Sequence, residues 1–125
     1  MKNQNIIFTG AIFMALAVSL GAFGAHALKK VLSPEMLTIY HTGVEYQFYH
    51  ALGLLIVGLT GLHIQSKYLS WAGIFLTVGI ILFSGSLYAL ALTGIKGLGA
   101  ITPLGGVSFI AGWIFLAVAV VRNSK

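Results

Sequence analysis

The sequence YLSWAGIFLTVGIILFSGSLYALALTGI, residues 68–95, contains no charged side chain. An α-helix needs about 20 mainly apolar residues to cross a bilayer, so this stretch is long enough to span one. Three further charge-free stretches occupy residues 3–28, 46–66 and 97–121. The pattern predicts an all-α integral membrane protein, a bundle of four transmembrane helices.

The composition of the whole chain indicates the same class. Of its 125 residues, 58% are hydrophobic and 7% are charged, whereas soluble domains carry about 25% charged residues. The expected helices use nearly all of the chain, so we expect a single transmembrane domain, residues 1–125. The net charge of +5 comes from basic residues scattered at the ends of the stretches. Because a nucleic-acid-binding protein gathers such residues into a patch, we expect membrane lipids as partners and no nucleic acid.

The first stretch has two interpretations. Lys2 precedes an apolar run that ends in Ala25-His26-Ala27, and small residues flanking one position are typical of a signal-peptide cleavage site. The apolar run is longer than the roughly 7–15 residues of a signal-peptide core. This length favours an uncleaved span over residues 6–27.

The second helix is expected to begin outside the hydrocarbon core. Ser33 is a typical N-cap, Pro34 suits the first helical position, and Glu35 interacts favourably with the positive end of the helix. Continued through its apolar part, this helix would be about 42 Å long at 1.5 Å per residue, longer than the roughly 30 Å hydrocarbon core. We therefore expect an interfacial start over residues 34–43 and a span over residues 44–62.

The remaining two spans are expected over residues 69–92 and 102–121. The glycine-rich connection between them, residues 93–103, is either a flexible loop or a re-entrant segment packed against protein. With four spans, both termini lie on one side of the membrane. The basic residues divide four against three between the two sides, namely Lys2, Lys67, Arg122 and Lys125 against Lys29, Lys30 and Lys96. The positive-inside rule then gives only a slight preference for cytoplasmic termini.

Small residues recur at four-residue spacing in two of the expected helices. They are Ala17, Gly21 and Ala25 in the first and Gly85, Ala89 and Thr93 in the third. Small residues let helix backbones approach closely, and helices associate in this way within lipid. The pattern favours a homo-oligomer, although glycine is also frequent in membrane helices in general.

Polar residues gather at the head of the second helix, and ionisable groups within a span are candidates for function because they are costly there. At about 100° per residue, His41 and Glu45 lie about 40° apart and can pair. His50 lies about 140° from Glu45 on the same projection, so these two side chains point to different neighbours. His50 instead shares a face with Gln47 and Tyr46. His26, at the end of the first helix, is expected at a depth similar to that of this cluster.

Three interpretations of the cluster remain open. One is purely structural, with the polar groups hydrogen-bonded across helices or to lipid headgroups. A second is a proton or solute path through Glu45 and His50. A third is a metal site of His26 with His41 and Glu45, or with His50, since zinc accepts imidazole and carboxylate ligands. The structural interpretation is favoured, so no metal and no other cofactor are expected.

Two hydroxyl groups flank a glycine inside the third helix, at Ser84-Gly85-Ser86. Within a helix, a serine can bond back to a carbonyl of its own helix or across to a neighbouring helix. The chain has no cysteine and no plausible Ser-His-carboxylate arrangement on one side of the membrane. No enzymatic activity is therefore expected.

Four sequence blocks occur in order along the chain: Gly21-Ala22-Phe23-Gly24-Ala25-His26, Glu45-Tyr46-Gln47 with His50, Phe83-Ser84-Gly85-Ser86-Leu87-Tyr88, and Thr102-Pro103-Leu104-Gly105-Gly106-Val107-Ser108-Phe109 with Gly112-Trp113. In order and spacing these blocks resemble the YgdD/YwdK family of small bacterial inner-membrane proteins, over essentially the whole chain. The resemblance implies a four-helix multi-pass protein of the inner or cytoplasmic membrane. It implies no known enzyme activity and no established cofactor, and it carries over no catalytic residue.

The family is largely of unknown function, and some staphylococcal members are associated with membrane stability. The resemblance therefore suggests a non-enzymatic, oligomeric protein that affects membrane integrity or organisation. The alternatives are an oligomeric channel or transporter for a small solute, an ion or protons, and a binder of lipid or another hydrophobic ligand. The candidate functional residues are the polar side chains of the blocks together with one more histidine of the second helix: His26, His41, Glu45, Gln47, His50, Ser84, Ser86 and Tyr88.

Overall fold

The computed structural model describes residues 1–123, and its regular structure is helical throughout. The helices are α1 (Asn3–His26), α2 (Pro34–Thr60), α3 (Lys67–Gly79), α4 (Gly85–Thr93) and α5 (Thr102–Asn123). No strand occurs among residues 1–123, which confirms the expected all-α class. Lys125, which the sequence argument assigns to the side of the termini, lies outside the described residues.

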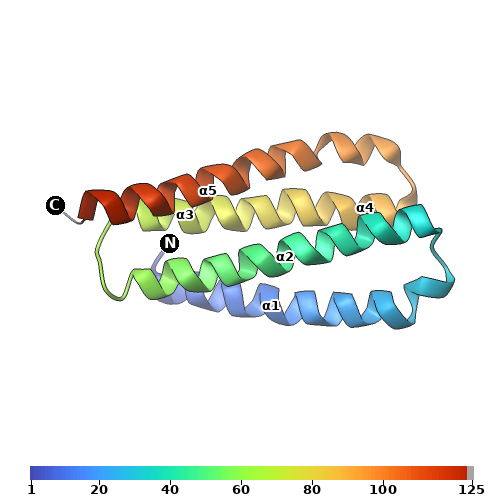
Figure 1. Ribbon diagram of the computed structural model, residues 1–125, viewed down its shortest axis with the longest axis horizontal. Coiled ribbons are helices and arrows are strands. Elements are labelled where there is room, and N and C mark those ends of the chain that lie inside the picture. The colour runs from blue at the N-terminus through green and yellow to red at the C-terminus, as the bar shows by residue number, and fades with distance from the viewer. Residues whose placement is uncertain (124–125) are drawn as a thin grey trace.

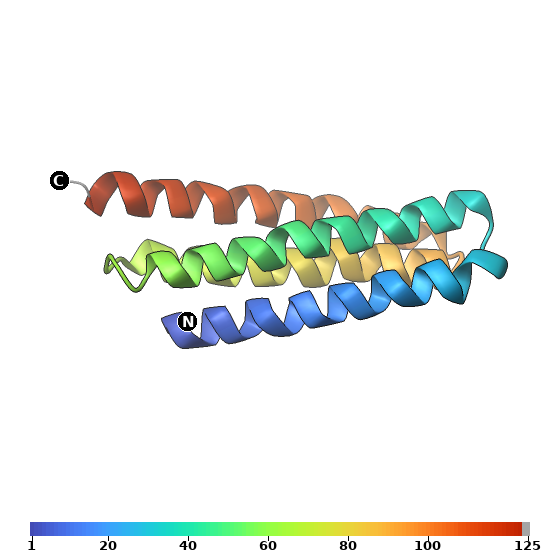
Figure 2. The same ribbon diagram turned by 60° about the horizontal axis from the view of Figure 1, so that its bottom comes forward.

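The helices form four rods that lie lengthwise against one another (Figure 1). One rod is composite, because a π-helical segment, Ile80–Ser84, joins α3 to α4 without a break. α1 packs mainly on α2, and α5 packs mainly on α3. In the turned view of Figure 2, α1 and α5 are the outermost rods, with α2 and the composite rod between them.

Three segments of the described chain are long and apolar enough to cross a membrane: Asn3–Lys30, Lys67–Thr93 and Lys96–Asn123. They include α1, the composite rod and α5. α2 is not among them, and its first half carries both acidic residues of the chain, Glu35 and Glu45. The expectation of a helical multi-pass protein is thus supported by three of the four rods.

The start of α2 is the one expected from the sequence. The Ser33 hydroxyl accepts a hydrogen bond from the backbone N–H of Met36 at 3.2 Å. Pro34 is the first helical residue, and Glu35 lies in the first turn. The N-cap prediction is therefore confirmed.

The connection between α4 and α5 is a compact turn at one end of the molecule (Figure 1). Gly94 ends α4 with φ +74°, a left-handed conformation that glycine adopts readily because it has no Cβ. A 3-10 helix, Lys96–Ala100, follows and buries none of its residues. The connection thus contains a short helical segment held by backbone hydrogen bonds, and the choice between a flexible and a re-entrant segment stays a prediction.

Most of the apolar core lies toward the end where α2 meets α3. Its largest buried members are Ile6, Leu54, Leu76 and Phe109. A smaller cluster at the other end gathers around Leu28, Tyr40 and Ala91. Along α2, the buried Gly43 and Gln47 lie between Tyr40 of one cluster and Leu54 of the other. The two apolar clusters are therefore separated by a polar layer.

The small residues of α1 serve contacts inside the molecule. α1 buries Gly10, Ala17 and Gly24, which are spaced seven apart and face α2. A Cβ atom built on Gly10 would lie 3.0 Å from the carbonyl oxygen of Ala51. Of the expected contact face, Ala17 is buried, Gly21 is half-buried against Val44 of α2, and Ala25 is exposed. The reason is that α1 packs along its whole length on α2, so the contact repeats about every two turns.

The second small-residue face is turned outward at its two ends, whereas Ala89 between them is half-buried. Gly85 is exposed, and no atom lies within 4 Å of the position its Cβ would take. Thr93 is also exposed.

Candidate functional site

The centre of the polar layer is the side-chain amide of Gln47 on α2, which is only 3% exposed. Its Nε2 donates to the carbonyl oxygen of Phe13 on α1 at 2.8 Å. Its Oε1 accepts from the hydroxyl of Tyr88 on α4 at 2.6 Å. One side chain therefore links three rods where no water is available to satisfy an amide.

The two serines of the Ser-Gly-Ser block complete the layer in different ways. The fully buried hydroxyl of Ser84 crosses to α2 and donates to the carbonyl oxygen of Gly43 at 2.6 Å. The hydroxyl of Ser86 bonds back to the carbonyl oxygen of Phe83 at 2.9 Å and shares a 2.6 Å hydrogen bond with the hydroxyl of Thr102 on α5. Both possibilities considered for a helical serine thus occur.

Close backbone approach makes these contacts possible. A Cβ atom on Gly43 would lie 2.8 Å from the ring of Tyr88, so glycine at this position lets the tyrosine reach Gln47. On the far side of the layer, the buried hydroxyl of Tyr40 donates to the carbonyl oxygen of Leu20 on α1 at 2.5 Å. Every fully buried side-chain N or O atom of the described residues has a hydrogen-bond partner. The layer is a satisfied structural network that fixes the register of the rods.

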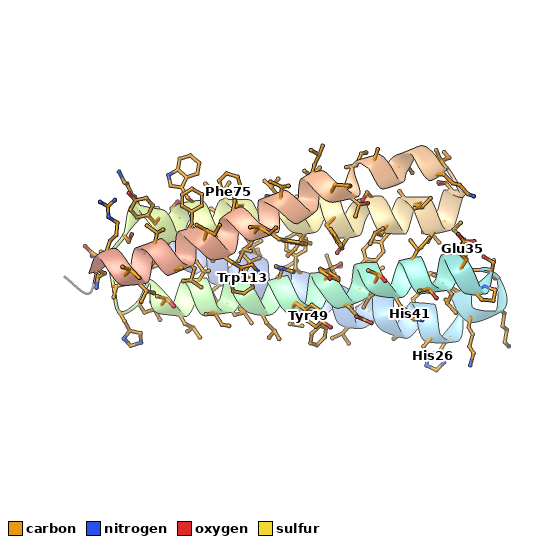
Figure 3. The ribbon with its side chains drawn as sticks, turned by 45° about the horizontal axis from the view of Figure 1, so that its top comes forward. His26, Glu35, His41, Tyr49, Phe75 and Trp113 are labelled. Carbon is orange, nitrogen blue, oxygen red and sulfur yellow. The ribbon has the colours of Figure 1, made fainter. Side chains whose placement is uncertain are left out.

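The charged and exposed members of the expected cluster lie elsewhere. Glu45 and His26 are exposed, and His41 is half-buried with its ring edge-on to Tyr40 at 6.0 Å between centroids. The only hydrogen bond to Glu45 among residues 1–123 comes from the Tyr49 hydroxyl at 3.4 Å. No hydrogen bond or ion pair joins His41 to Glu45 in the described structure. Figure 3 shows Tyr49 of α2 and His26 of α1 pointing away from the packed helices.

No metal centre forms from these residues. Residues 1–123 contain no group of three or more His, Cys, Asp or Glu side chains close enough to hold a metal ion. Because Glu45 and the three expected histidine ligands face different directions, the metal interpretation has no geometric support.

His50 lies apart from the polar layer, on the side of α2 that faces α5. It is 6% exposed, and its Nδ1 lies 2.7 Å from the carbonyl oxygen of Tyr46. Its ring stacks on Phe109 of α5 with the centroids 3.5 Å apart and the planes 8° from parallel. The expected shared face with Tyr46 is confirmed, since the two rings lie nearly parallel at 6.0 Å.

A groove of about 410 Å³ opens above the His50 ring, between α2 and α5. Its residues are Tyr46, His50, Phe83, Pro103, Gly106, Val107, Phe109, Ile110 and Trp113. His50 was predicted from the sequence as a candidate, but the aromatic residues around it were not. The available signal was that Phe83, Phe109 and Trp113 belong to the same sequence blocks as the polar candidates.

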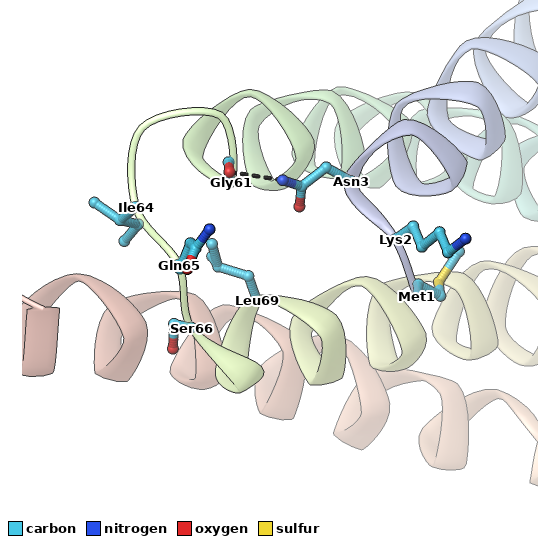
Figure 4. A pocket seen from close by; sticks show the side chains of 8 residues that line it. All are labelled: Met1, Lys2, Asn3, Gly61, Ile64, Gln65, Ser66 and Leu69. Atoms are coloured by element: carbon cyan, nitrogen blue, oxygen red, sulfur yellow. Dashed lines mark hydrogen bonds between the residues drawn. The ribbon is translucent and has the colours of Figure 1, made fainter.

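A second cavity, of about 330 Å³, lies at the end of the molecule where the N-terminus meets the turn between α2 and α3 (Figure 4). Asn3 donates from Nδ2 to the carbonyl oxygen of Gly61 at 2.6 Å there, and the N-terminal amino group of Met1 contacts the Ser70 hydroxyl. None of the candidate residues lines this cavity.

Comparison with known proteins is consistent with this architecture. Residues 20–106 match the family model described as a protein of unknown function, DUF423. The chain is 50% identical over 117 residues to the UPF0382 membrane protein YwdK of Bacillus subtilis, covering 93% of this chain and 95% of the relative. It is 49% identical over 116 residues to a UPF0382 membrane protein of Staphylococcus epidermidis, covering 93% and 94%.

Over all 125 residues the chain is 39% identical to the UPF0382 inner membrane protein YgdD of Escherichia coli K12, 95% of which is covered. No solved structure matches the chain. Relatives named as membrane and inner-membrane proteins, together with three helices able to cross a bilayer, establish the chain as a membrane protein. On the sequence blocks, the family model and these relatives, the chain belongs to the DUF423 family, which includes YwdK and YgdD.

Proposed function

We propose that this protein is a non-enzymatic membrane protein that crosses the bilayer four times and self-associates through the outward face of α2. Through this association it affects membrane organisation or integrity. The observation that carries the proposal is an exposed carboxyl group, Glu45, near the middle of the packed helices.

The depth of Glu45 follows from the register of α1 and α2. Gln47 contacts the carbonyl of Phe13, which lies close to the midpoint of α1. Glu45 is two residues from Gln47, a displacement of about 3 Å along the helix axis. If α1 crosses the bilayer, Glu45 lies in the central part of a hydrocarbon core that is roughly 30 Å thick. This is deeper than the expected span over residues 44–62 would place it.

A carboxyl group at that depth is unfavourable in contact with lipid chains, which offer no hydrogen-bond donor. Its contact with Tyr49 is long, at 3.4 Å. In a dimer with twofold symmetry, the same surface of both copies meets itself. The Tyr49 hydroxyl of each copy can then donate to Glu45 of the other, and both groups leave the lipid.

The residues that continue from Glu45 along α2 suit a helix–helix contact. Tyr49, Leu52, Ile56 and Leu59 are 53%, 44%, 50% and 53% exposed. Counted from Glu45, the spacing of four, three, four and three residues keeps these side chains on one edge of the helix, as in left-handed helix pairs. We call these residues with Glu45 the α2 edge.

The position of α2 supports a fourth crossing. It lies between α1 and the composite rod, both of which are apolar enough to span. Its polar groups Gln47 and His50 are buried by the other helices, so they do not have to face lipid. The absence of enzymatic activity stays a prediction that follows from the sequence and the resemblance.

Cross-linking in membranes tests self-association directly, and the natural chain has no cysteine to interfere. We expect a Leu52→Cys variant to form disulfide-linked dimers under mild oxidation. The control is Ile81→Cys, which is 57% exposed on the composite rod rather than on the α2 edge. Adding Glu45→Ala to Leu52→Cys should reduce the dimer yield several-fold. Equal yields from Leu52→Cys and Ile81→Cys would contradict a specific α2 interface.

The effect on the membrane is tested in cells that lack the protein. We expect greater entry of a normally excluded dye, restored to normal by the natural chain but not by Glu45→Ala. A Glu45→Ala variant that no longer forms dimers but still restores dye exclusion would contradict this link. Membrane integrity would then not depend on self-association.

The channel or transporter alternative requires Glu45 and His50 to line one path between copies. The two residues lie on different sides of α2, and the His50 ring is stacked on Phe109. This geometry favours the structural proposal over a conduit. The test is the flux of protons, monovalent ions or small osmolytes into proteoliposomes. Flux through the natural chain that is lost in both Glu45→Gln and His50→Phe would favour the conduit instead.

A further inference from the structure

The groove between α2 and α5 combines an aromatic lining with one buried polar side chain. Its floor consists of His50 and Phe109, which are 6% and 4% exposed. Tyr46 and Trp113, 37% and 38% exposed, stand at its rim. The volume of about 410 Å³ lies within the range of roughly 300–1,000 Å³ that is usual for small-molecule sites.

The rim is held in place by close packing. A Cβ atom on Gly53 would lie 2.8 Å from the Trp113 ring, so the indole lies directly on the backbone of α2. The Tyr46 ring packs on Phe83 with their centroids 4.5 Å apart. Figure 3 shows Trp113 where α5 passes over α2. The site is therefore built by rigid helices and not by a loop.

The hydrogen bonding of His50 determines what the groove can recognise. The atom next to Nδ1 is a backbone carbonyl oxygen, which can only accept, so Nδ1 carries the proton and donates. In the neutral ring, Nε2 is then an acceptor. Nε2 forms no hydrogen bond with any group of residues 1–123. Because no fully buried side-chain N or O atom of these residues lacks a partner, Nε2 must be partly accessible, and His50 lines the groove. Nε2 therefore opens into the groove.

The depth of His50 makes water an unsuitable partner for that acceptor. His50 is three residues from Gln47, about 4.5 Å along the axis, and so lies near the middle of α1 as well. The groove opens between exposed Val107 and Ile110, which are suited to lipid. An acyl chain could fill the groove, but it would leave Nε2 without a donor, which is unfavourable in an apolar medium.

We propose that this groove is a binding site for an apolar membrane-soluble molecule with a phenolic hydroxyl group. The hydroxyl donates to Nε2 of His50, and the aromatic ring lies against Phe109, between the rings of Tyr46 and Trp113. Any apolar tail leaves the groove past Val107 and Ile110 into the surrounding lipid. The proposal does not depend on self-association, because the α2 edge is a different face of α2.

The test uses para-hexylphenol and its methyl ether, para-hexylanisole, which has the same ring and tail but no donor. Trp113 is a built-in reporter, and a Trp71→Phe background removes the other tryptophan. In lipid nanodiscs we expect the phenol to change Trp113 fluorescence saturably. The ether should bind about tenfold more weakly, since one hydrogen bond is lost.

The variant His50→Phe removes the acceptor and retains a flat ring against Phe109. We expect it to bind the phenol about tenfold more weakly and to bind the phenol and the ether equally. The matched control is His63→Phe, an exposed histidine in the turn after α2, which should leave both affinities unchanged.

Equal binding of the phenol and the ether by the natural chain would overturn the proposal without reference to any variant. Such a result would make the groove a simple apolar crevice for lipid chains. Unchanged phenol binding in His50→Phe would overturn it as well.

Discussion

At the scale of single residues, the polar side chains of this membrane protein fall into two groups. Gln47, Tyr88 and Ser84 satisfy one another or backbone carbonyls inside the molecule. Glu45 and His50 each retain hydrogen-bonding capacity that faces outward or into a groove. Polar groups that are satisfied inside the molecule determine register, whereas groups that retain hydrogen-bonding capacity mark surfaces that something else completes.

The hydrogen bond between Tyr88 and Gln47 should contribute measurably to stability. We expect Tyr88→Phe to lower the free energy of unfolding by about 1–2 kcal/mol, because it leaves the buried amide oxygen without its donor. The matched control is Tyr46→Phe, since no hydrogen bond is recorded for the Tyr46 hydroxyl among residues 1–123. Unfolding in mixed micelles with increasing denaturing detergent measures both. Equal effects of the two changes would contradict the structural role of the polar layer.

At the scale of elements, the rods are joined by backbone contacts that only glycine permits. α5 meets the π-helical segment at Gly105, where a Cβ atom would lie 2.7 Å from Cβ and 2.8 Å from Cα of Phe83. A Cβ atom on the next residue, Gly106, would have only one neighbouring atom within 4 Å outside its own helix, Cδ2 of Phe83 at 4.0 Å. Two adjacent glycines in one helix thus have different roles.

The two glycines give a matched pair of variants. Gly105→Ala should lower the unfolding free energy by about 1–3 kcal/mol, because α5 must move away from the backbone of Phe83. Gly106→Ala should be neutral or slightly stabilising, since alanine favours the helix over glycine. Thermal unfolding in detergent distinguishes the two, and equal melting temperatures would show that the close approach of α5 is not tightly constrained.

The sequence predicted the helices more accurately than their interiors. Ser33 and Pro34 indicated the start of α2, and the charge-free stretches indicated the rods. The π-helical segment Ile80–Ser84 was not predicted, because its residues are equally compatible with a continuous α-helix. It forms where Ser84 reaches the carbonyl of Gly43, and that partner is known only once α2 is in place.

At the scale of the whole molecule, the basic residues collect at the two ends of the rods. Lys67 begins α3, and Arg122, near the end of α5, donates to the hydroxyl of Tyr68 at 2.7 Å. Lys29 and Lys30 lie at the opposite end, beyond α1. This distribution suits a protein whose long axis is perpendicular to the membrane plane.

Single-cysteine labelling tests whether α2 is the fourth crossing. We expect a membrane-impermeant maleimide to reach His63→Cys and Asn123→Cys from one side of the membrane. It should reach Val31→Cys and Gly97→Cys from the other. All four positions are exposed, and the natural chain has no cysteine. Labelling of Val31→Cys and His63→Cys from the same side would show that α2 does not cross.

Sequence alone determined that this is an all-helical membrane protein, where its rods begin, and which polar residues belong to its motif blocks. Charge-free length and local capping depend on neighbours in the chain, so they can be read without a fold. The tertiary structure decided that Gln47, Ser84 and Tyr88 are internal partners, that Glu45 faces outward, and that His50 forms the floor of an aromatic groove. Those roles depend on which residues other helices bring to the same depth, and this information lies in the packing of the rods.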